Sequence, residues 1–258
     1  MRLASLPMYD ADPGAVDAWW RAIARALRAQ GVGEVPERLE RPATLDAHWR
    51  DPRLLLSQTC GYPLVTTLST TVQVVGAFRY TAPGCAGIAY RSELVARVDD
   101  AQGIEHYRGR VAAVNALDSH SGWNALRGLV APLAPDGTFF GDRVVTGSHR
   151  ASLAAVRAGV ADIAAIDCVS LAGFRRHDPA LLRGLHVVGS TARAPGLPLV
   201  TSRLTSPAEL DALRRALQAA CGDASAAAAR ESLFIDGFEP ADLQAWQDIA
   251  DVRSLAVT

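Results

Sequence analysis

Strand–turn–helix units recur along the whole chain, and this pattern constrains the fold more than any other sequence feature. Short apolar segments such as 54–56, 111–114 and 163–166 are each followed by a polar turn and then by apolar residues at helical spacing. Apolar runs of this kind are typical of strands buried on both faces of a parallel sheet. The sequence therefore predicts an α/β fold with mostly parallel sheets flanked by helices, whose ligands bind beyond the carboxyl ends of the strands.

The same spacing predicts the position of individual elements. A long helix is expected over 13–29, with Pro13 in its first turn and Gly31 just after its last. Further helices are expected at 44–49, 123–133, 207–220 and 240–250. Three more are expected to begin at a turn: one starts at residue 61, one follows the turn 146–149 and ends at 158, and one follows 167–168 and ends at 174. Extended segments are expected at 3–7, 53–59, 72–80, 87–98, 111–114, 144–145, 163–166, 185–191 and 232–235.

Composition excludes several classes of protein. The 258 residues are 49% hydrophobic and 21% charged, which excludes a disordered chain, and the net charge of -1 gives no bulk attraction to nucleic acid or to an anionic membrane. All 26 basic residues are arginine, so a Schiff-base lysine and a phosphate-loop NTPase are excluded. No segment has the roughly 18 consecutive apolar residues of a spanning helix.

Three strand-to-helix turns, at 59–62, 119–122 and 146–149, carry small hydroxyl residues at a helix start. Backbone N–H groups at a helix N-terminus are unpaired and carry partial positive charge, so converging turns of this kind can bind an oxyanion without Lys or Arg. The alternative is that each Ser or Thr only caps its helix. His120 and His149 lie in two of these turns, where an imidazole can donate to an anion.

Asp167 follows the apolar segment 163–166, and two roles are open for it: accepting a hydrogen bond from a ligand, or capping the next helix. Nucleophile, zinc-protease and dinucleotide motifs are missing from the sequence, so no catalytic residue and no metal ligand is predicted. Cys60 and Cys85 lie beside turns and could pair in an exported protein, whereas in the cytosol they would stay reduced. Tyr9, Tyr62 and Trp123 lie in or after turns, where they could wall a ligand site.

Five segments of the sequence resemble the substrate-binding proteins of phosphate, phosphite and phosphonate ABC transporters. They are LASLPMYD (3–10), LLLSQTCGYPL (54–64), GCAGIAYRS (84–92), RGRVAAVNALDSHSGWNALR (108–127) and GSHRASLAAVRAGVADIAAIDCV (147–169). The S-x-S-G turn and the G-S-H helix start are the more specific pieces. The resemblance implies the two-lobed type II periplasmic-binding-protein fold, with a cleft between lobes that close by a hinge motion.

The resemblance also implies the lobes and the site. Lobe one would comprise 1–80 and 190–258, and lobe two would be the inserted segment 81–189. The oxyanion would lie on the S-x-S-G turn and the histidine of the following helix, and the opposite lobe would close over it. The ligand-binding residues implied are Tyr9, Gln58, Thr59, Tyr62, Ser119, His120, Ser121, Gly122, His149 and Asp167.

The first hypothesis is a non-enzymatic binding protein for a small oxyanion of the phosphonate, phosphite or phosphate class, with no cofactor and with an ABC transporter permease as a partner. The alternatives are a cytoplasmic enzyme on the same fold, resembling the chorismate dehydratases, and a cytoplasmic ligand sensor. The family is periplasmic, but the start of the chain turns polar too soon for a signal peptide, so a cytoplasmic location stays open. Neither nucleic acid nor a membrane is expected as a partner.

Overall fold

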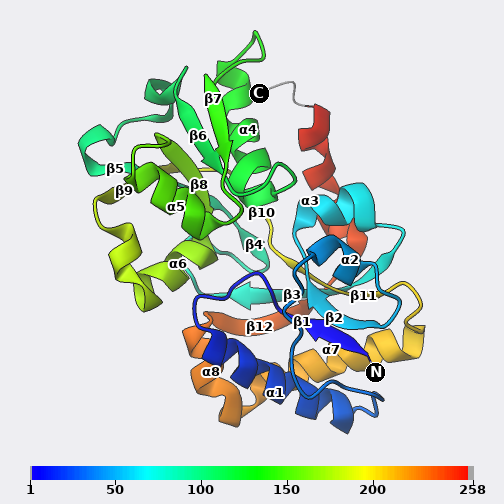
Figure 1. Ribbon diagram of the computed structural model, residues 1–258. Helices are drawn as coiled ribbons and strands as arrows, with labels where there is room; N and C mark the ends of the chain where they lie inside the picture. Colours follow the sequence, from blue (N-terminus) through cyan, green and yellow to red (C-terminus); the bar gives the residue numbers. More distant parts are fainter. Residues whose placement is uncertain (1, 255–258) are drawn as a thin grey trace. The chain divides into compact units, whose positions relative to one another are not determined.

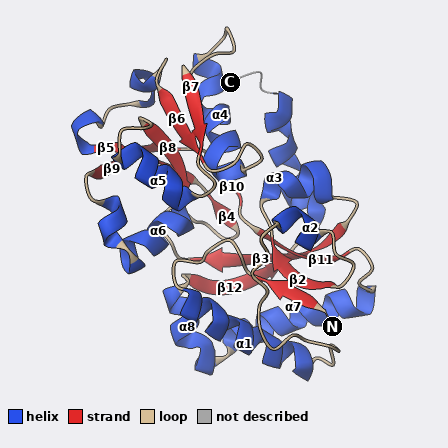
Figure 2. Ribbon diagram, in the orientation of Figure 1, coloured by secondary structure: helices blue, strands red, loops and turns tan. Residues whose placement is uncertain are grey.

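Two five-stranded sheets, each flanked by helices, organise the protein in the computed structural model, which describes residues 2–254 (Figures 1 and 2). The chain forms two units. The first contains the described residues up to Thr81, Ala86–Ile88 and Pro195–Gln247. The second contains Ala82–Cys85, Ala89–Ala194 and the described residues from Asp248 on. Within 2–254, no helix combines the length and the apolarity needed to cross a bilayer.

In the first unit, the sheet has the order β1–β2–β11–β3–β12. Strand β1 is parallel to β2, whereas β11 is antiparallel to both β2 and β3, and β12 is antiparallel to β3. The long helices α1 and α7 pack on this sheet and share its apolar core (Figure 1). The strands are β1 (Leu3–Ser5), β2 (Leu54–Gln58), β3 (Val72–Tyr80), β11 (Pro198–Ser202) and β12 (Ile235–Pro240).

Helix α1 (Pro13–Ala29) has the limits that the sequence predicts. Asp12 caps it by accepting a 3.0 Å hydrogen bond from the Ala15 amide, and Pro13 takes a first-turn position that needs no N–H partner. Its buried face, with Trp19 and Ile23, packs into the core. The other helices of the unit are α2 (Leu45–Trp49), α3 (Gly61–Pro63) with a π-helical turn (Leu64–Leu68), α7 (Pro207–Gly222), a 3-10 turn (Ala224–Ala226) and α8 (Ala227–Ser232).

In the second unit, the sheet has the order β7–β6–β8–β5–β9. The central strand β6 is parallel to β7 and β8, whereas β5 is antiparallel to β8 and β9. The strands are β5 (Ser92–Arg97), β6 (Val111–Val114), β7 (Asp142–Val145), β8 (Ile163–Asp167) and β9 (Leu185–Ser190). The helices are α4 (Ala125–Val130), α5 (His149–Arg157) and α6 (Cys168–His177), with a π-helical turn (His120–Asn124) before α4 and 3-10 turns at Val98–Asp100, Ile104–Tyr107, Ala131–Leu133 and Pro179–Leu182.

The chain crosses between the two units near two short paired strands, β4 (Ala89–Tyr90) and β10 (Ala194–Pro195). The last helix is a 3-10 helix, Leu243–Ser254, which runs from residues of the first unit into residues of the second. The predicted lobes place 248–254 in lobe one, whereas these residues group with the second unit.

The structure corrects three expectations from the sequence. Both sheets are mixed rather than mostly parallel, because burial on both faces, as in β2, requires only that both faces are covered and not that the neighbours are parallel. Strand β11 (Pro198–Ser202) was not among the expected extended segments, and its first residue is a proline, which central strands rarely contain. The last strand lies at Ile235–Pro240 instead of 232–235, because the alanine-rich segment before it continues as α8.

Candidate functional site

The S-x-S-G turn begins the helical segment that follows β6 in the second unit. Ser119 shapes the turn with two of its oxygens. Its hydroxyl accepts a 3.1 Å hydrogen bond from the Gly122 amide, and its carbonyl accepts 3.0 Å hydrogen bonds from the backbone and the side-chain amide of Asn124. Ser119 is therefore a capping residue, as expected under the alternative that the Ser and Thr residues of these turns cap their helices.

Ser121 and His149 bring two of the three predicted turns together. The Ser121 hydroxyl and His149 Nε2 are 3.1 Å apart, although 28 positions separate the residues in the sequence. On the other side, the Ser92 hydroxyl donates a 2.8 Å hydrogen bond to the Ser121 carbonyl. His149 is the first residue of α5, whose cap Ser148 accepts from the Ala151 amide at 3.1 Å. The turns at 119–122 and 146–149 thus form one local site.

Asn115 belongs to the same site, although the sequence analysis did not select it. A Cβ atom at Gly122 would lie 1.7 Å from Asn115 Oδ1 and 3.3 Å from His149 Cε1, so the missing side chain of this glycine makes the close approach possible. The signal that could have found Asn115 is its position directly after the carboxyl end of β6, where polar residues of α/β folds meet ligands.

Burial keeps both histidines of the site neutral. Desolvation lowers the pKa of His149 to about 4, and it lowers the pKa of His120 to about 4 as well. His149 Nδ1 and Asn115 Oδ1 are both inaccessible to solvent and have no hydrogen-bond partner among residues 2–254. Buried polar atoms of this kind usually have a partner, so the hydrogen-bonding capacity of these two atoms is not used by the residues that the structure describes, and a ligand or water reaches them only if the site opens.

Asp167 is a helix cap. Its Oδ1 accepts hydrogen bonds from the Val169 amide at 2.7 Å and from the Ser170 amide at 3.0 Å, and its side chain is buried. Of the two roles that the sequence left open for Asp167, the structure shows the capping of α6. A role toward a ligand stays a prediction.

In the first unit, Tyr9 and Gln58 lie around Tyr80, which the sequence analysis missed. Gln58 Nε2 donates a 3.0 Å hydrogen bond to the Tyr80 hydroxyl, and the rings of Tyr9 and Tyr80 meet edge to face with centroids 5.2 Å apart. All three residues line a small cavity of about 20 Å³, whose other walls are mostly apolar: Leu6, Val16, Trp19, Phe78, Leu233 and Ile235. This group offers aromatic surface and no cation.

Thr59 and Tyr62, the remaining predicted residues of the first unit, have mainly backbone roles in the structure. Thr59 is fully buried and donates its amide to the Pro198 carbonyl at 3.0 Å, which ties the end of β2 to β11. Tyr62 is half-buried in the short helix α3, and its carbonyl accepts a 2.7 Å hydrogen bond from the Thr66 hydroxyl.

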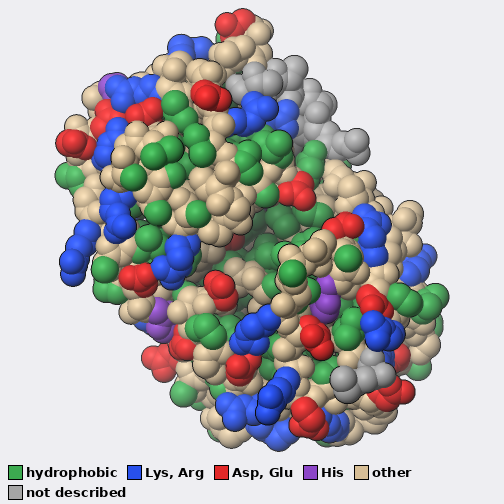
Figure 3. Space-filling view, viewed as in Figure 1, with side chains coloured by type: hydrophobic (Ala, Val, Ile, Leu, Met, Phe, Trp, Pro, Cys, Tyr) green, Lys and Arg blue, Asp and Glu red, His purple; other side chains and the backbone are tan. Residues whose placement is uncertain are grey.

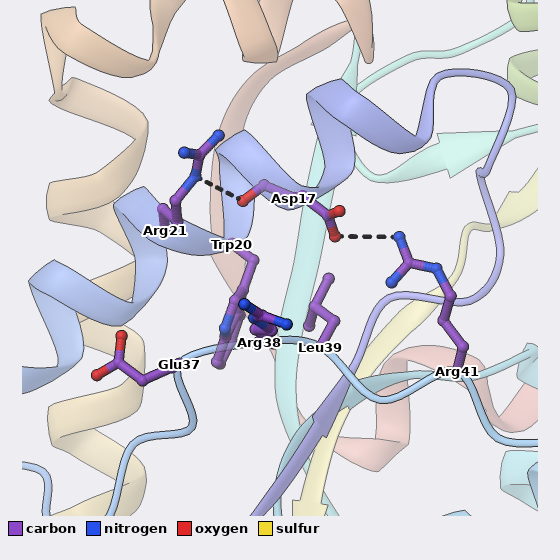
Figure 4. Close-up of a pocket in the computed structure, with 7 residues that line it drawn as sticks. All are labelled: Asp17, Trp20, Arg21, Glu37, Arg38, Leu39 and Arg41. Atoms are coloured by element: carbon purple, nitrogen blue, oxygen red, sulfur yellow. Dashed lines mark hydrogen bonds and ion pairs between the residues drawn. The ribbon is translucent and has the colours of Figure 1, made fainter.

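A larger cavity of about 780 Å³ lies between α1 and the segment 37–41 of the first unit (Figure 4). It contains none of the predicted site residues. Three arginines (Arg21, Arg38 and Arg41) and two carboxylates (Asp17 and Glu37) line it. Arg41 pairs with Asp17 at 3.0 Å, and Glu37 pairs with Arg28 at 2.8 Å. Arginine and carboxylate side chains are interspersed in the same way over the face shown in Figure 3. Among residues 2–254, no group of three His, Cys, Asp or Glu side chains could hold a metal ion.

A family model identifies the family of the chain. A family model described as the periplasmic substrate-binding protein of a phosphonate ABC transporter matches residues 63–246, which include the S-x-S-G turn, His149 and Asp167. A search of curated protein sequences gives no match.

Solved structures show the fold. PhnD1 from Prochlorococcus marinus in complex with methylphosphonate is 14% identical, with 97% of this chain and 96% of that chain covered and a TM-score of 0.76. A binding protein component of an ABC phosphonate transporter from Pseudomonas aeruginosa is 16% identical, with 98% and 86% covered and a TM-score of 0.76. XAC2383 from Xanthomonas citri bound to ATP is 18% identical, with 98% of each chain covered and a TM-score of 0.71. The α/β, two-lobed fold of periplasmic binding proteins is thereby confirmed.

Proposed function

Because the chain belongs to the family of periplasmic substrate-binding proteins of phosphonate ABC transporters, we propose that its own substrate is a small phosphorus oxyanion held by the S-x-S-G turn and His149. The family has a substrate-binding role, and the proposal adds the ligand class, the binding residues and the absence of catalysis. The carrying observation is the 3.1 Å contact between the Ser121 hydroxyl and His149 Nε2, beside two buried polar atoms that have no partner within 2–254.

Neutral groups supply the anion binding in this proposal. The helical segment from His120 begins at an N-terminus whose dipole favours negative charge. The Gly122 amide already donates to the Ser119 hydroxyl, and this hydroxyl can in turn donate to the anion. The pKa of about 4 makes His149 neutral at pH 7, so only one of its ring nitrogens carries a proton. The Ser121–His149 pair therefore offers the anion one donor: the Ser121 hydroxyl when His149 Nε2–H donates to it, or His149 Nδ1–H when the hydroxyl donates to Nε2. Asn115 can donate through its amide nitrogen, because the oxygen and nitrogen of an Asn side chain exchange places by a half-turn.

The first unit supplies a different chemistry. Tyr9, Tyr80 and Gln58 present aromatic rings and one amide around a cavity of about 20 Å³, a volume comparable with one water molecule or one methyl group. We assign the organic substituent of the phosphonate to these residues, with Tyr62 and Thr59 on the adjoining segment. The methylphosphonate in the Prochlorococcus protein is a ligand of this type. A ligand-binding role of His120 and Asp167 is part of the same proposal.

The partner that follows from the family is an ABC transporter permease, and the location that follows is the periplasm. Delivery to a permease requires release of an unchanged ligand, so the proposal has no reaction step. No specific observation favours the enzyme or the cytoplasmic sensor.

Titration calorimetry with methylphosphonate, phosphite, phosphate, ATP, sulfate and acetate tests the proposal. We expect heat with one or more of the phosphorus oxyanions and none with sulfate or acetate at the same concentration. Ser121→Ala should weaken binding about tenfold, because it removes one hydrogen bond to a charged ligand. Ser206→Ala, which removes the cap of α7 in the first unit, is the matched control and should leave the affinity unchanged. Binding of acetate alone, or an unchanged affinity in Ser121→Ala, would contradict it.

A further inference from the structure

Two cysteines of the second unit lie in contact. The sulfur atoms of Cys85 and Cys168 are 3.5 Å apart, although 83 positions separate the residues in the sequence. Cys168 is buried and Cys85 is half-buried, so one thiol of the pair can be reached from solvent. From the sequence, Cys60 was the candidate partner of Cys85. The structure places Cys168 beside Cys85 instead.

The backbone on both sides of this contact is held in place. Segment 82–85 forms a turn in which the Cys85 amide donates to the Ala82 carbonyl at 3.0 Å, and Arg193 Nε donates to the Gly84 carbonyl at 3.1 Å. Cys168 begins α6, and its amide donates to the Arg91 carbonyl at 3.0 Å.

Gly84 allows the two segments to come this close. Its φ angle is +105°, and a Cβ atom on it would lie 3.0 Å from Cys168 Cβ and 3.2 Å from Cys168 Sγ. The turn therefore presents Cys85 directly onto the first residue of α6. A disulfide needs sulfur atoms about 2.05 Å apart, which leaves about 1.5 Å of approach for two side chains that already touch.

We propose that Cys85 and Cys168 form a disulfide by exchange with a disulfide oxidant such as oxidised glutathione or a protein disulfide. The Cys85 thiolate attacks one sulfur of the oxidant, which forms a mixed disulfide and releases one thiol. The Cys168 thiolate then attacks Cys85 Sγ and displaces the second thiol. Two electrons pass to the oxidant, and the two cysteine protons end on the two thiols that are released.

The surroundings of Cys85 set the speed of the first attack. The hydrogen bond to Cys168, burial and the charge of Asp167 all raise the pKa of the Cys85 thiol, whereas Arg193 lowers it. Little thiolate is present at neutral pH, so the exchange is slow there and becomes faster as the pH rises. An oxidising compartment such as the periplasm, where the family acts, provides the oxidant and keeps the protein exposed to it long enough for this slow exchange.

The disulfide ties the turn at 82–85 to the first residue of α6, directly after Asp167. It closes a loop of more than eighty residues that contains β5, β6 and β8. A crosslink across a loop of this length restricts the unfolded chain and raises the melting temperature, on the order of 5 °C or more for a protein of this size. The proposal does not depend on which ligand the protein binds.

The experiment uses the full purified chain after dithiothreitol treatment, incubated with oxidised glutathione between pH 7 and pH 9. Free thiols are counted by maleimide labelling in denaturant and mass spectrometry, and the disulfide is located by peptide mapping. We expect the four thiols of the reduced protein to fall to two, with a Cys85–Cys168 peptide, a higher melting temperature and a rate that rises about tenfold per pH unit.

Matched variants assign the bond. Cys60→Ser and Cys221→Ser should still lose two thiols, whereas Cys85→Ser should keep its remaining cysteines free of an internal disulfide. The peptide map of the unmodified chain keeps the test valid if a variant does not fold. Four free thiols after prolonged incubation at pH 9, or an internal disulfide that contains Cys60 or Cys221, would overturn the proposal.

Discussion

Acidification from pH 7 to pH 5 should destabilise the protein through the two buried histidines. His120 and His149 have a pKa of about 4 in the folded state against 6.5 for an ordinary histidine, with burial as the cause in both. The unfolded chain takes up these two protons as the pH falls through 6.5, whereas the folded protein does not take them up until about pH 4. Stability is therefore retained above pH 6.5 and lost progressively below it.

The magnitude follows from these pKa values. Each histidine whose pKa is shifted from 6.5 to about 4 lowers the protein's free energy of unfolding by about 2 kcal/mol between pH 7 and pH 5. The two histidines together lower it by about 4 kcal/mol. Asp51 and Asp223, whose pKa values are lowered to about 2, contribute only at lower pH. Burial also lowers the pKa of His48, which adds to the slope of every variant equally.

Urea unfolding at half-unit steps from pH 7 to pH 5 measures the effect. The variants are His149→Gln and His120→Gln, which keep a polar side chain without a titrating ring, and the control is His186→Gln at an exposed position. Each of the first two should reduce the loss between pH 7 and pH 5 by about 2 kcal/mol, and the control should leave it unchanged. An equal loss in all four proteins would refute the assignment of neutral, buried histidines.

Substitutions at three further positions test the local geometry. Gly122→Ala should lower stability by about 2 kcal/mol or more and remove oxyanion binding, because its Cβ would lie 1.7 Å from Asn115 Oδ1; Gly222→Ala, with open space around it, is the control for unfolding and calorimetry. Asp167→Ala should cost about 1 to 2 kcal/mol in thermal unfolding through loss of the α6 cap, and Asp167→Asn clearly less, so equal costs would contradict the capping role. Gly76→Ala should destabilise the first unit by about 2 kcal/mol or more in urea unfolding, because the φ angle of Gly76 is +154° and a Cβ there would lie 2.3 Å from the Glu239 carbonyl oxygen. Unchanged stability would contradict this and show that the contact between β3 and β12 can relax.

Local sequence signals predicted the elements that depend on local physics. Helix α1 has its cap, its first-turn proline and its apolar face within one continuous segment, and its predicted limits agree with the structure. Strand β6 was equally clear as an apolar run between polar turns. Strand β11 was missed because its place in the sheet depends on β2 and β3, which lie more than a hundred residues away.

In the candidate site, too, the residues with a local sequence signal were predicted and the contacts between distant segments were not. The turns at 119–122 and 146–149 were selected for their hydroxyl and histidine residues, but their meeting through Ser121 and His149 is a tertiary contact that no local pattern contains. Asn115 and Tyr80 carry no motif: the position of Asn115 directly after β6 is its one sequence signal, and Tyr80 is distinguished only by its contacts, such as the hydrogen bond from Gln58. The pairing of Cys85 with Cys168 is likewise a matter of distance in space.

The position of β11 has a consequence for the order in which the protein can fold during synthesis. Strand β11 separates β2 from β3 in the first sheet, so these two strands have no common neighbour until residue 202 has left the ribosome. The sheet of the second unit, in contrast, is complete once residue 190 has emerged. We expect the sheet of the second unit to fold first, while β2 and β3 expose unpaired edges that a chaperone could protect. Release of nascent chains between these two lengths would leave half of the protein native and half prone to aggregation.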